Sequence, residues 1–154
     1  MRGNERRTAW SSLAFALVVT GLLFTGLAQM PLFKRYWIAD VPGFAWTAEY
    51  YTTHLIHYLL AIALLFWLMR RAGLAMGAWI QGSPPDALVL TKTLVWVGIL
   101  ATGLARVVKN SPDFFFSPTT TMVIDWAHLG FVALLGPVAL VVSLKRSGKQ
   151  SRPD

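Results

Sequence analysis

The sequence predicts an all-α protein, an integral membrane four-helix bundle, and three observations lead to this prediction. The 154 residues are 55% hydrophobic and 14% charged, whereas a soluble domain carries about 25% charged residues. The mean hydropathy of +0.52 leaves too little polar sequence for a water-exposed globule or a disordered chain. Four apolar runs are long enough to cross a bilayer, which takes roughly 20 residues per helix.

We expect the spans at about residues 9–30, 48–69, 87–108 and 122–144. They should be helices, because an open strand leaves its backbone polar groups unsatisfied in lipid. Pro and Gly mark the connections, at Pro42–Gly43, Gly82–Pro85 and Ser111–Pro118. Residues 1–154 are predicted to form a single transmembrane domain, and no soluble domain, internal repeat or low-complexity segment is expected.

The basic residues predict the orientation of the spans. Nine of them flank one side, against at most four on the other, so the positive-inside rule places both termini in the cytoplasm. The first apolar run is longer than the core of a signal peptide, so we expect a retained signal anchor. The predicted location is a bacterial inner (cytoplasmic) membrane, crossed several times. The inner set is Arg2, Arg6, Arg7, Arg70, Arg71, Lys145, Arg146, Lys149 and Arg152, and the outer set is Lys34, Arg35, Arg106 and Lys109.

The two predicted outer connections are rich in aromatic residues. These residues fit an interfacial belt at the membrane surface. They also fit a docking surface for an outer partner, and both interpretations stay open here. The residues concerned are Phe33, Tyr36, Trp37, Phe44, Trp46, Phe114, Phe115 and Phe116.

Composition also excludes several kinds of site. The chain has no cysteine, which excludes disulfides, zinc–thiolate sites, cysteine-ligated clusters and covalently attached haem. The net charge of +7 does not predict nucleic-acid binding, because the basic residues flank apolar runs. No nucleotide loop, nucleophile constellation or carboxylate pair is present, so the chain by itself is not a complete enzyme.

The three histidines are the main candidates for chemistry, since ionisable residues inside spans are costly and usually functional. His57 lies ten residues after Thr47, and His128 lies eight after Thr120, about 15 and 12 Å along a helix. His54 lies one turn before His57. Alternate helices of a four-helix bundle tend to be diagonal, so histidines of the second and fourth spans should face each other.

Two facing imidazoles are what a haem iron with two axial histidines needs. Zinc would need three or four ligands, including carboxylate or thiolate helpers that are missing at this depth. The alternative is that the histidines form hydrogen bonds between helices. The matched depth favours one haem b, with His128 and either His54 or His57 as the metal ligands.

Neighbouring residues could complete a cofactor site. Gly103 and Gly21 would leave room for the edges of a porphyrin, although close helix packing explains glycines equally well. Arg106 lies about 6 Å inside the predicted end of its span. Together with Lys109 and Asn110 it could bind haem propionates, and the alternative is a snorkelling arginine.

A quinone, menaquinone or ubiquinone, is a further expected ligand. Candidate contacts on the outer half are His54, Tyr50, Tyr51 and Asp125. Asp125 is also explained as an interfacial carboxylate near a helix N-terminus. Lys92 marks a competing, less favoured position on the cytoplasmic half.

Three segments resemble the four-helix membrane cytochrome b superfamily, which includes the cytochrome b subunits of formate dehydrogenases and nickel–iron hydrogenases and the cytochrome b561-type proteins. The segments are His54–Tyr58, Thr102–Asn110 and Asp125–Gly130. The resemblance implies b-haem between histidines on different helices, with His57 and His128 as axial ligands and His54 as the second choice. Members with two haems use four histidines, commonly including one on the first helix, and this chain has three histidines and none there.

Two functions follow. The first is a haem b electron-transfer subunit that links the quinone pool to an extracytoplasmic redox partner (a cytochrome c, iron–sulfur or molybdenum protein) in a respiratory complex. The second is a cofactor-free membrane anchor or assembly subunit of a larger complex. Both involve membrane lipid and other membrane subunits, and neither involves nucleic acid.

Overall fold

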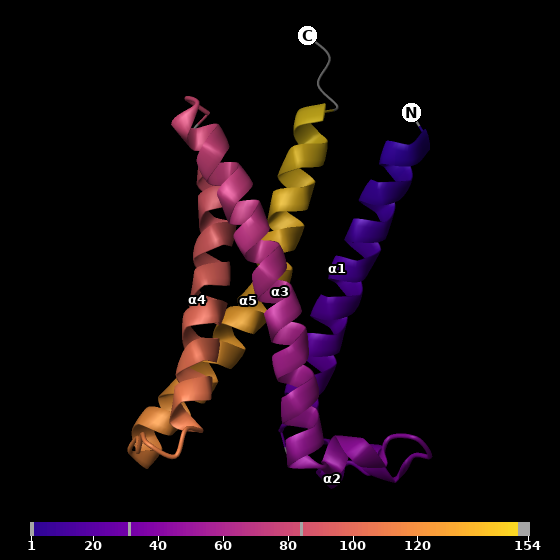
Figure 1. Cartoon of the computed structure of the whole chain (residues 1–154), viewed down its shortest axis with the longest axis vertical. Coiled ribbons are helices and arrows are strands. Elements are labelled where there is room, and N and C mark those ends of the chain that lie inside the picture. Colours follow the sequence, from indigo (N-terminus) through magenta and orange to yellow (C-terminus); the bar gives the residue numbers. More distant parts are fainter. Residues whose placement is uncertain (1, 31, 84, 151–154) are drawn as a thin grey trace. The chain divides into compact units, whose positions relative to one another are not determined.

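The computed structural model describes residues 2–30, 32–83 and 85–150, and these residues form helices and short connections with no strand (Figure 1). The chain divides into two compact units, residues 1–74 and 75–154. In the first unit α1 (Arg2–Ala28) is joined to α3 (Tyr50–Ile80) by α2 (Leu32–Arg35) and two 3₁₀ turns, η1 (Ile38–Asp40) and η2 (Ala45–Ala48). The last residues of α3 belong to the second unit, which also contains α4 (Ala87–Lys109) and α5 (Pro118–Gln150).

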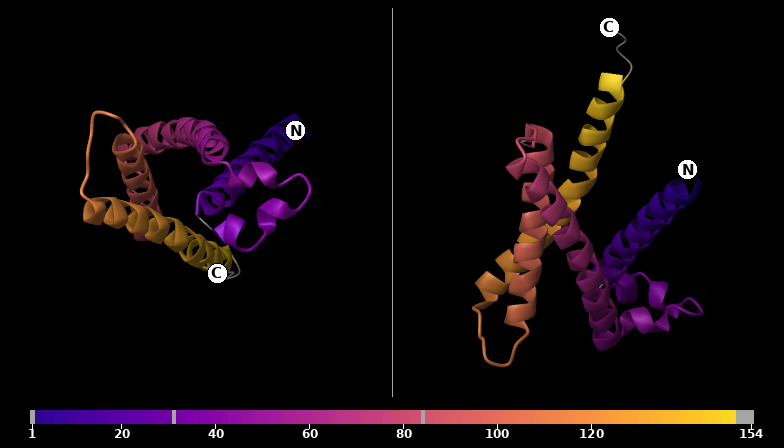
Figure 2. Two further views of the ribbon diagram at one scale, coloured as in Figure 1. Left: turned by 90° about the horizontal axis from the view of Figure 1, so that it is seen from below. Right: turned by 45° about the horizontal axis from the view of Figure 1, so that its top comes forward.

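Four of the described helices are long and apolar enough to span a membrane, as the sequence predicts. Such a set of helices is typical of a multi-pass membrane protein. The candidate spans are Trp10–Ala28, Tyr50–Ile80, Ala87–Lys109 and Pro118–Lys145. Within the second unit α4 and α5 pack against each other and lie side by side in every view (Figures 1 and 2).

The second span is longer than predicted. We expected it to end near Arg70 and Arg71, but α3 continues through both residues to Ile80. Residues 72–80 are mostly Ala, Leu, Met and Trp, and their propensity outweighs Gly73 and Gly77. The helix then stops at Gly82, whose φ of +89° is the left-handed conformation that glycine adopts easily.

Side-chain caps set the starts of α4 and α5, the first just after the predicted breaker Gly82–Pro85 and the second at the predicted breaker Ser117–Pro118. The side chain of Asp86 accepts a hydrogen bond from the Val89 amide (3.0 Å) and caps α4. Ser117 accepts one from the Thr120 amide (3.1 Å), and Pro118 follows it at the first position of α5. Pro137 lies inside α5, where helices that cross membranes tolerate proline.

The connection between α1 and α3 packs back onto α1 through aromatic rings. Phe24 lies 5.2 Å from Phe33, 6.1 Å from Phe44 and 5.9 Å from Trp46, measured between ring centroids. Thr47 is buried beside them and donates to the Phe44 carbonyl (2.7 Å). Phe33 and Trp46 of the predicted belt therefore form a small local core with Phe24, Phe44 lies at its edge (37% exposed), and Tyr36 and Trp37 are more exposed.

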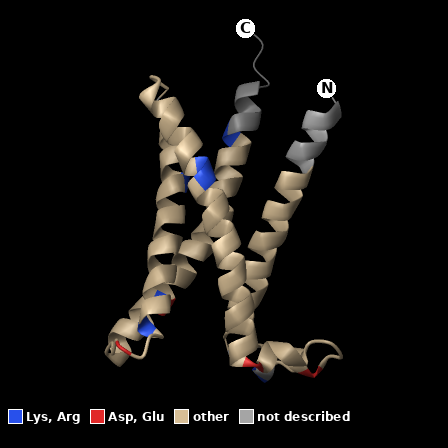
Figure 3. Cartoon of the chain, in the orientation of Figure 1, with Lys and Arg blue, Asp and Glu red and all other residues tan. Residues whose placement is uncertain are grey.

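Long stretches of the described helices carry no charge (Figure 3). Many large apolar side chains are exposed, such as Phe66 (74%) and Leu104 (65%), as expected of surfaces that face lipid. Much of the charge pattern behind the predicted orientation lies outside the described side chains. This holds for Arg2, Arg6, Arg7, Lys34, Arg146, Lys149 and Arg152.

Candidate functional site

His57 on α3 is hydrogen-bonded to Thr25 on α1. The Thr25 hydroxyl oxygen lies 2.8 Å from His57 Nδ1, and Thr25 is almost completely buried. The same hydroxyl donates to the Gly21 carbonyl (2.8 Å), with a longer contact to that of Leu22 (3.3 Å).

His128 on α5 makes the corresponding contact with Thr102 on α4. The Thr102 hydroxyl oxygen lies 3.0 Å from His128 Nδ1. This hydroxyl donates to the Gly98 carbonyl (2.6 Å), with a longer contact to that of Ile99 (3.2 Å). Each unit therefore holds one histidine through a threonine of the preceding long helix.

The protons of these contacts can be assigned. A threonine hydroxyl has a single proton, and in Thr25 and Thr102 it is donated to a backbone carbonyl four residues earlier. With the hydroxyl proton donated to the carbonyl, the oxygen accepts from the ring, and this arrangement favours Nδ1 of His57 and of His128 as the protonated nitrogen. A neutral imidazole protonated at Nδ1 has its lone pair on Nε2, and such a nitrogen can bind a metal.

Each histidine ring lies beside a glycine of the partner helix, at a distance where a Cβ would make ordinary van der Waals contact. A Cβ atom at Gly26 would lie 3.5 Å from Cε1 of His57, and one at Gly103 would lie 3.4 Å from Cε1 of His128. The predicted candidate Gly103 is therefore next to a histidine ring. Gly21 has a different neighbour, because a Cβ there would lie 2.9 Å from Cδ1 of Leu60.

His54 has a different environment from His57. Its ring lies against Tyr50 (centroids 4.1 Å apart, 34° between planes) and edge-on to Tyr58 (5.3 Å, 82°). The three residues follow each other at four-residue spacing along one stripe of α3. Tyr51 lies next to Tyr50 (5.9 Å) but is 87% exposed.

The charged candidates of the second unit form one cluster. Lys109 Nζ donates to both oxygens of Asp125 (2.7 and 2.6 Å), and Arg106 Nε lies 2.9 Å from Oδ1. Asp125 precedes His128 by three residues and is on the same side of α5. Asn110 caps the end of α4 next to this cluster. The cluster has two positive charges and one negative charge, so it retains a net positive charge.

The histidines lie at somewhat different positions along their helices than predicted. Because α3 begins at Tyr50 and α5 at Pro118, His57 is seven residues from its helix start and His128 is ten. These offsets correspond to about 10 and 15 Å at the α-helical rise. The order is the reverse of that predicted, but the difference is still only about one helical turn.

No group of three or more His, Asp or Glu side chains among the described residues could bind a metal ion by itself. A haem iron makes a smaller demand, because the macrocycle supplies four nitrogens and the protein only the axial ligands. The chemistry of two Nδ1-protonated histidines fits that demand.

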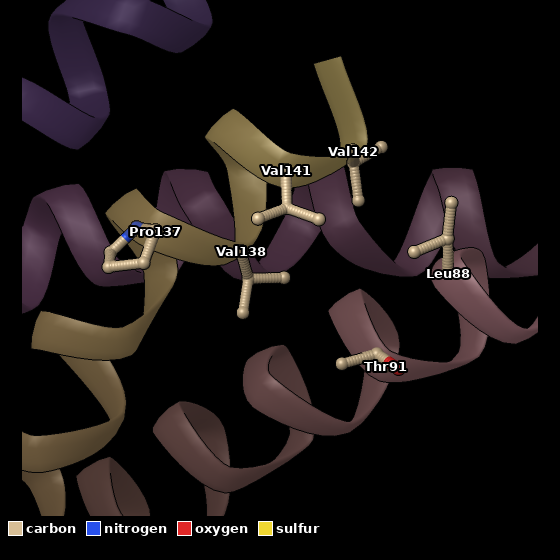
Figure 4. A pocket seen from close by; sticks show the side chains of 6 residues that line it. All are labelled: Leu88, Thr91, Pro137, Val138, Val141 and Val142. Carbon is tan, nitrogen blue, oxygen red and sulfur yellow. The ribbon is translucent and has the colours of Figure 1, made fainter. Parts of the chain in front are cut away.

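An open apolar pocket lies between α4 and α5 (Figure 4), and its lining residues on α5 begin nine residues after His128, at Pro137. The Thr91 hydroxyl donates to the Ala87 carbonyl (2.9 Å), so the pocket offers no uncommitted hydroxyl proton. Lys92, the competing quinone candidate, is not among the lining residues. The residues that line the pocket are Leu88, Thr91, Pro137, Val138, Val141 and Val142.

Sequence reasoning missed the two threonines. The signal was available, because Gly21–Ala28 (GLLFTGLA) and Gly98–Ala105 (GILATGLA) agree at six of eight positions. This match of eight residues is shorter than a structural repeat, and the expectation of no internal repeat stays a prediction. Identity between short apolar segments is easily dismissed, and here the contacts of Thr25 and Thr102 give the match its meaning.

The chain matches no protein-family model, and no curated protein or solved structure matches it. The resemblance to membrane cytochromes b thus depends on the short motifs around the histidines, and membership of that superfamily stays a prediction.

Proposed function

We propose that this chain is a haem b-containing electron-transfer subunit of a membrane complex, with His57 and His128 as the two axial ligands of one haem. The observation that supports the proposal best is the pair of threonine contacts. They favour the tautomer of each ring that has its proton on Nδ1 and its lone pair on Nε2. Metal-bound histidines usually donate their other ring N–H to a neighbouring acceptor. When bound, the haem would supply a one-electron carrier.

The same contacts favour His57 over His54 as the ligand of α3. His57 and His128 each have their own threonine partner and a neighbouring glycine, whereas His54 lies between two tyrosines. In the proposal, the cluster of Arg106 and Lys109 provides positive charge for the propionates, with Asn110 beside it. Asp125 offsets part of that charge and orients both cations.

The aromatic stack of α3 supports a quinone contact on the outer half of the chain. A quinone ring can stack on tyrosine, and the His54 imidazole can form a hydrogen bond to a quinone oxygen. Asp125 is less suited to this role because its carboxylate is paired with Lys109 and Arg106. The pocket near Thr91 fits an alkyl chain better than a quinone headgroup, because its lining is apolar.

The proposed setting is a bacterial cytoplasmic membrane with both termini inside. An extracytoplasmic redox protein would then dock on the outer connections, where Tyr36, Trp37 and Phe115 are exposed. Cross-linking from these residues should capture the partner. Cross-links confined to residues 81–86 would contradict this orientation of the complex.

The reduced-minus-oxidised absorption spectrum of the purified chain tests the haem. A bis-histidine b-type spectrum is expected for the wild type, and it should be lost in His128→Ala and in His57→Ala. His54→Ala should change it less, and Lys92→Ala is the matched control in a span. If the wild-type chain purified from membranes binds no haem, the proposal is wrong and the anchor function takes its place.

Binding of a quinone-analogue inhibitor tests the second site. The inhibitor should shift the haem spectrum of the wild type and bind more weakly to His54→Ala. Weaker binding to Lys92→Ala with unchanged binding to His54→Ala would move the quinone to the other half of the chain.

A further inference from the structure

The two similar segments, Gly21–Ala28 and Gly98–Ala105, also make similar contacts. In the first unit Thr25 contacts His57, the next residue Gly26 lies beside the same ring, and Gly21 faces Leu60. Leu60 is three residues after His57, so the contacts involve two adjacent turns of α3.

The second unit reproduces each of these contacts. Thr102 bonds to His128, the next residue Gly103 lies beside that ring, and Gly98 faces Phe131. Phe131 is again three residues after the histidine. The sequence separation between threonine and histidine differs, at 32 and 26 residues. The similarity therefore belongs to the helix segments that carry these residues and not to the connections.

We infer that the two units contain copies of one histidine-orienting device, in which Thr25 and Thr102 are positioning residues that fix His57 and His128 as Nδ1-protonated imidazoles. The glycine four residues before each threonine gives its carbonyl to the hydroxyl proton. The glycine after each threonine lies beside the ring, with 3.5 Å from a Gly26 Cβ to His57 Cε1 and 3.4 Å from a Gly103 Cβ to His128 Cε1. Because the arrangement is present once per unit, both histidines have their lone pair on Nε2, although the surroundings of the two histidines differ.

This inference deepens the proposed function and, for its second test, depends on it. A hydrogen bond from Nδ1–H to an acceptor raises the basicity of Nε2 as a ligand. A more basic axial ligand stabilises the oxidised iron. Removal of either hydroxyl should therefore raise the midpoint potential of the haem, and equivalent devices should give similar shifts for the two threonines.

The first test needs no haem. Nitrogen-15 NMR of the full chain labelled at its three histidines, in lipid nanodiscs without added haem, reports which ring nitrogen is protonated. His57 and His128 should both be Nδ1-protonated in the wild type. Thr25→Val and Thr102→Val keep the side-chain shape but remove the hydroxyl, and each should shift only its own histidine toward the Nε2-protonated form.

Matched variants separate orientation from packing. Thr25→Ser and Thr102→Ser retain the hydroxyl and should keep the wild-type tautomers. Thr93→Val is the control, because Thr93 lies on α4 with the same type of bond to a carbonyl four residues earlier (2.9 Å) but is exposed. It should leave all three histidines unchanged.

The second test is the midpoint potential of the haem-loaded protein. It should rise in each valine variant, rise further in the double variant, and stay near the wild-type value in the serine variants and in Thr93→Val. Nε2-protonated His57 and His128 in the wild type, or valine variants with unchanged tautomers, would overturn the inference. A wild-type chain that shows the expected tautomers but binds no haem would overturn only the proposed function.

Discussion

The pair of α1 and α3 and the pair of α4 and α5 orient a histidine in the same way but surround it differently. The residues next to His57 on α3 are aromatic: one turn away, the His54 ring lies against Tyr50 and edge-on to Tyr58. Near His128 the neighbours are charged, because Asp125 one turn away is paired with two cations. A threonine anchored to the backbone therefore contacts Nδ1 of each histidine in both pairs, while the other residues near it on the histidine-bearing helix differ.

The connection between α1 and α3 and the connection between α4 and α5 also differ, in how far their aromatic rings are packed. The longer one, between α1 and α3, is fastened to the helices by an aromatic core around Phe24. The shorter one, between α4 and α5, leaves Phe114, Phe115 and Phe116 exposed, at 56%, 95% and 39%. The first connection therefore presents a packed aromatic surface, and the second presents exposed aromatic rings.

The largest effect that would sharpen this comparison is expected from Phe24→Ala. Phe24 is only half-buried, so its loss should cost the first connection about 2 kcal/mol, slightly below the usual range for core aromatics. Trypsin cleavage after the exposed Arg35 should then be roughly 30-fold faster, if cleavage follows local opening. Phe115→Ala is the control, with an expected change within about 0.5 kcal/mol. Equal cleavage rates in the two variants would contradict the aromatic core.

The charged neighbourhood of His128 predicts a second effect. Asp125→Ala leaves Lys109 (12% exposed) and Arg106 (24% exposed) without their shared carboxylate. Because the Asp125 side chain is itself 40% exposed, we expect a loss of about 1.5–2 kcal/mol in the free energy of unfolding, measured by thermal unfolding in detergent. Asp40→Ala, at an exposed carboxylate of the first unit, should have little effect. If both variants are equally stable, the cluster has no structural role.

The smallest effect compares the two equivalent glycines. At Gly98 a Cβ would meet three ring atoms of Phe131 at 2.5–2.7 Å, and a packed ring cannot easily move aside. Gly98→Ala should therefore cost about 1–2 kcal/mol, as overpacking does. At Gly21 the obstacle is the flexible end of Leu60, so Gly21→Ala should be close to neutral.

Gly130→Ala is the control for this comparison, because nothing lies within 4 Å of a Cβ there. It should raise stability by up to about 1 kcal/mol through helix propensity alone. Thermal unfolding of the three variants under one condition is sufficient. A larger loss of stability for Gly21→Ala than for Gly98→Ala would contradict the order that the distances predict.

Much of the fold could be predicted because its signals are local. Apolar length gave four spans, and Asp86, Ser117 and Gly82 set helix ends through their own backbone and side-chain bonds. The end of α3 was the exception. Arg70 and Arg71 were interpreted as a boundary, but long basic side chains can extend toward polar surroundings from within a helix.

The sequence by itself determined which residue types are available for chemistry: three histidines, no cysteine and few charges inside long apolar spans. It could not distinguish His54 from His57, because both lie on the same helix one turn apart. In a soluble helix the apolar stripe would have marked the buried face. In these helices the faces toward protein and toward lipid are both apolar, so periodicity marks neither. Only the tertiary structure decided that Thr25 meets His57 and Thr102 meets His128, since packing brings the small and hydroxyl-bearing residues of one helix against the rings of the next.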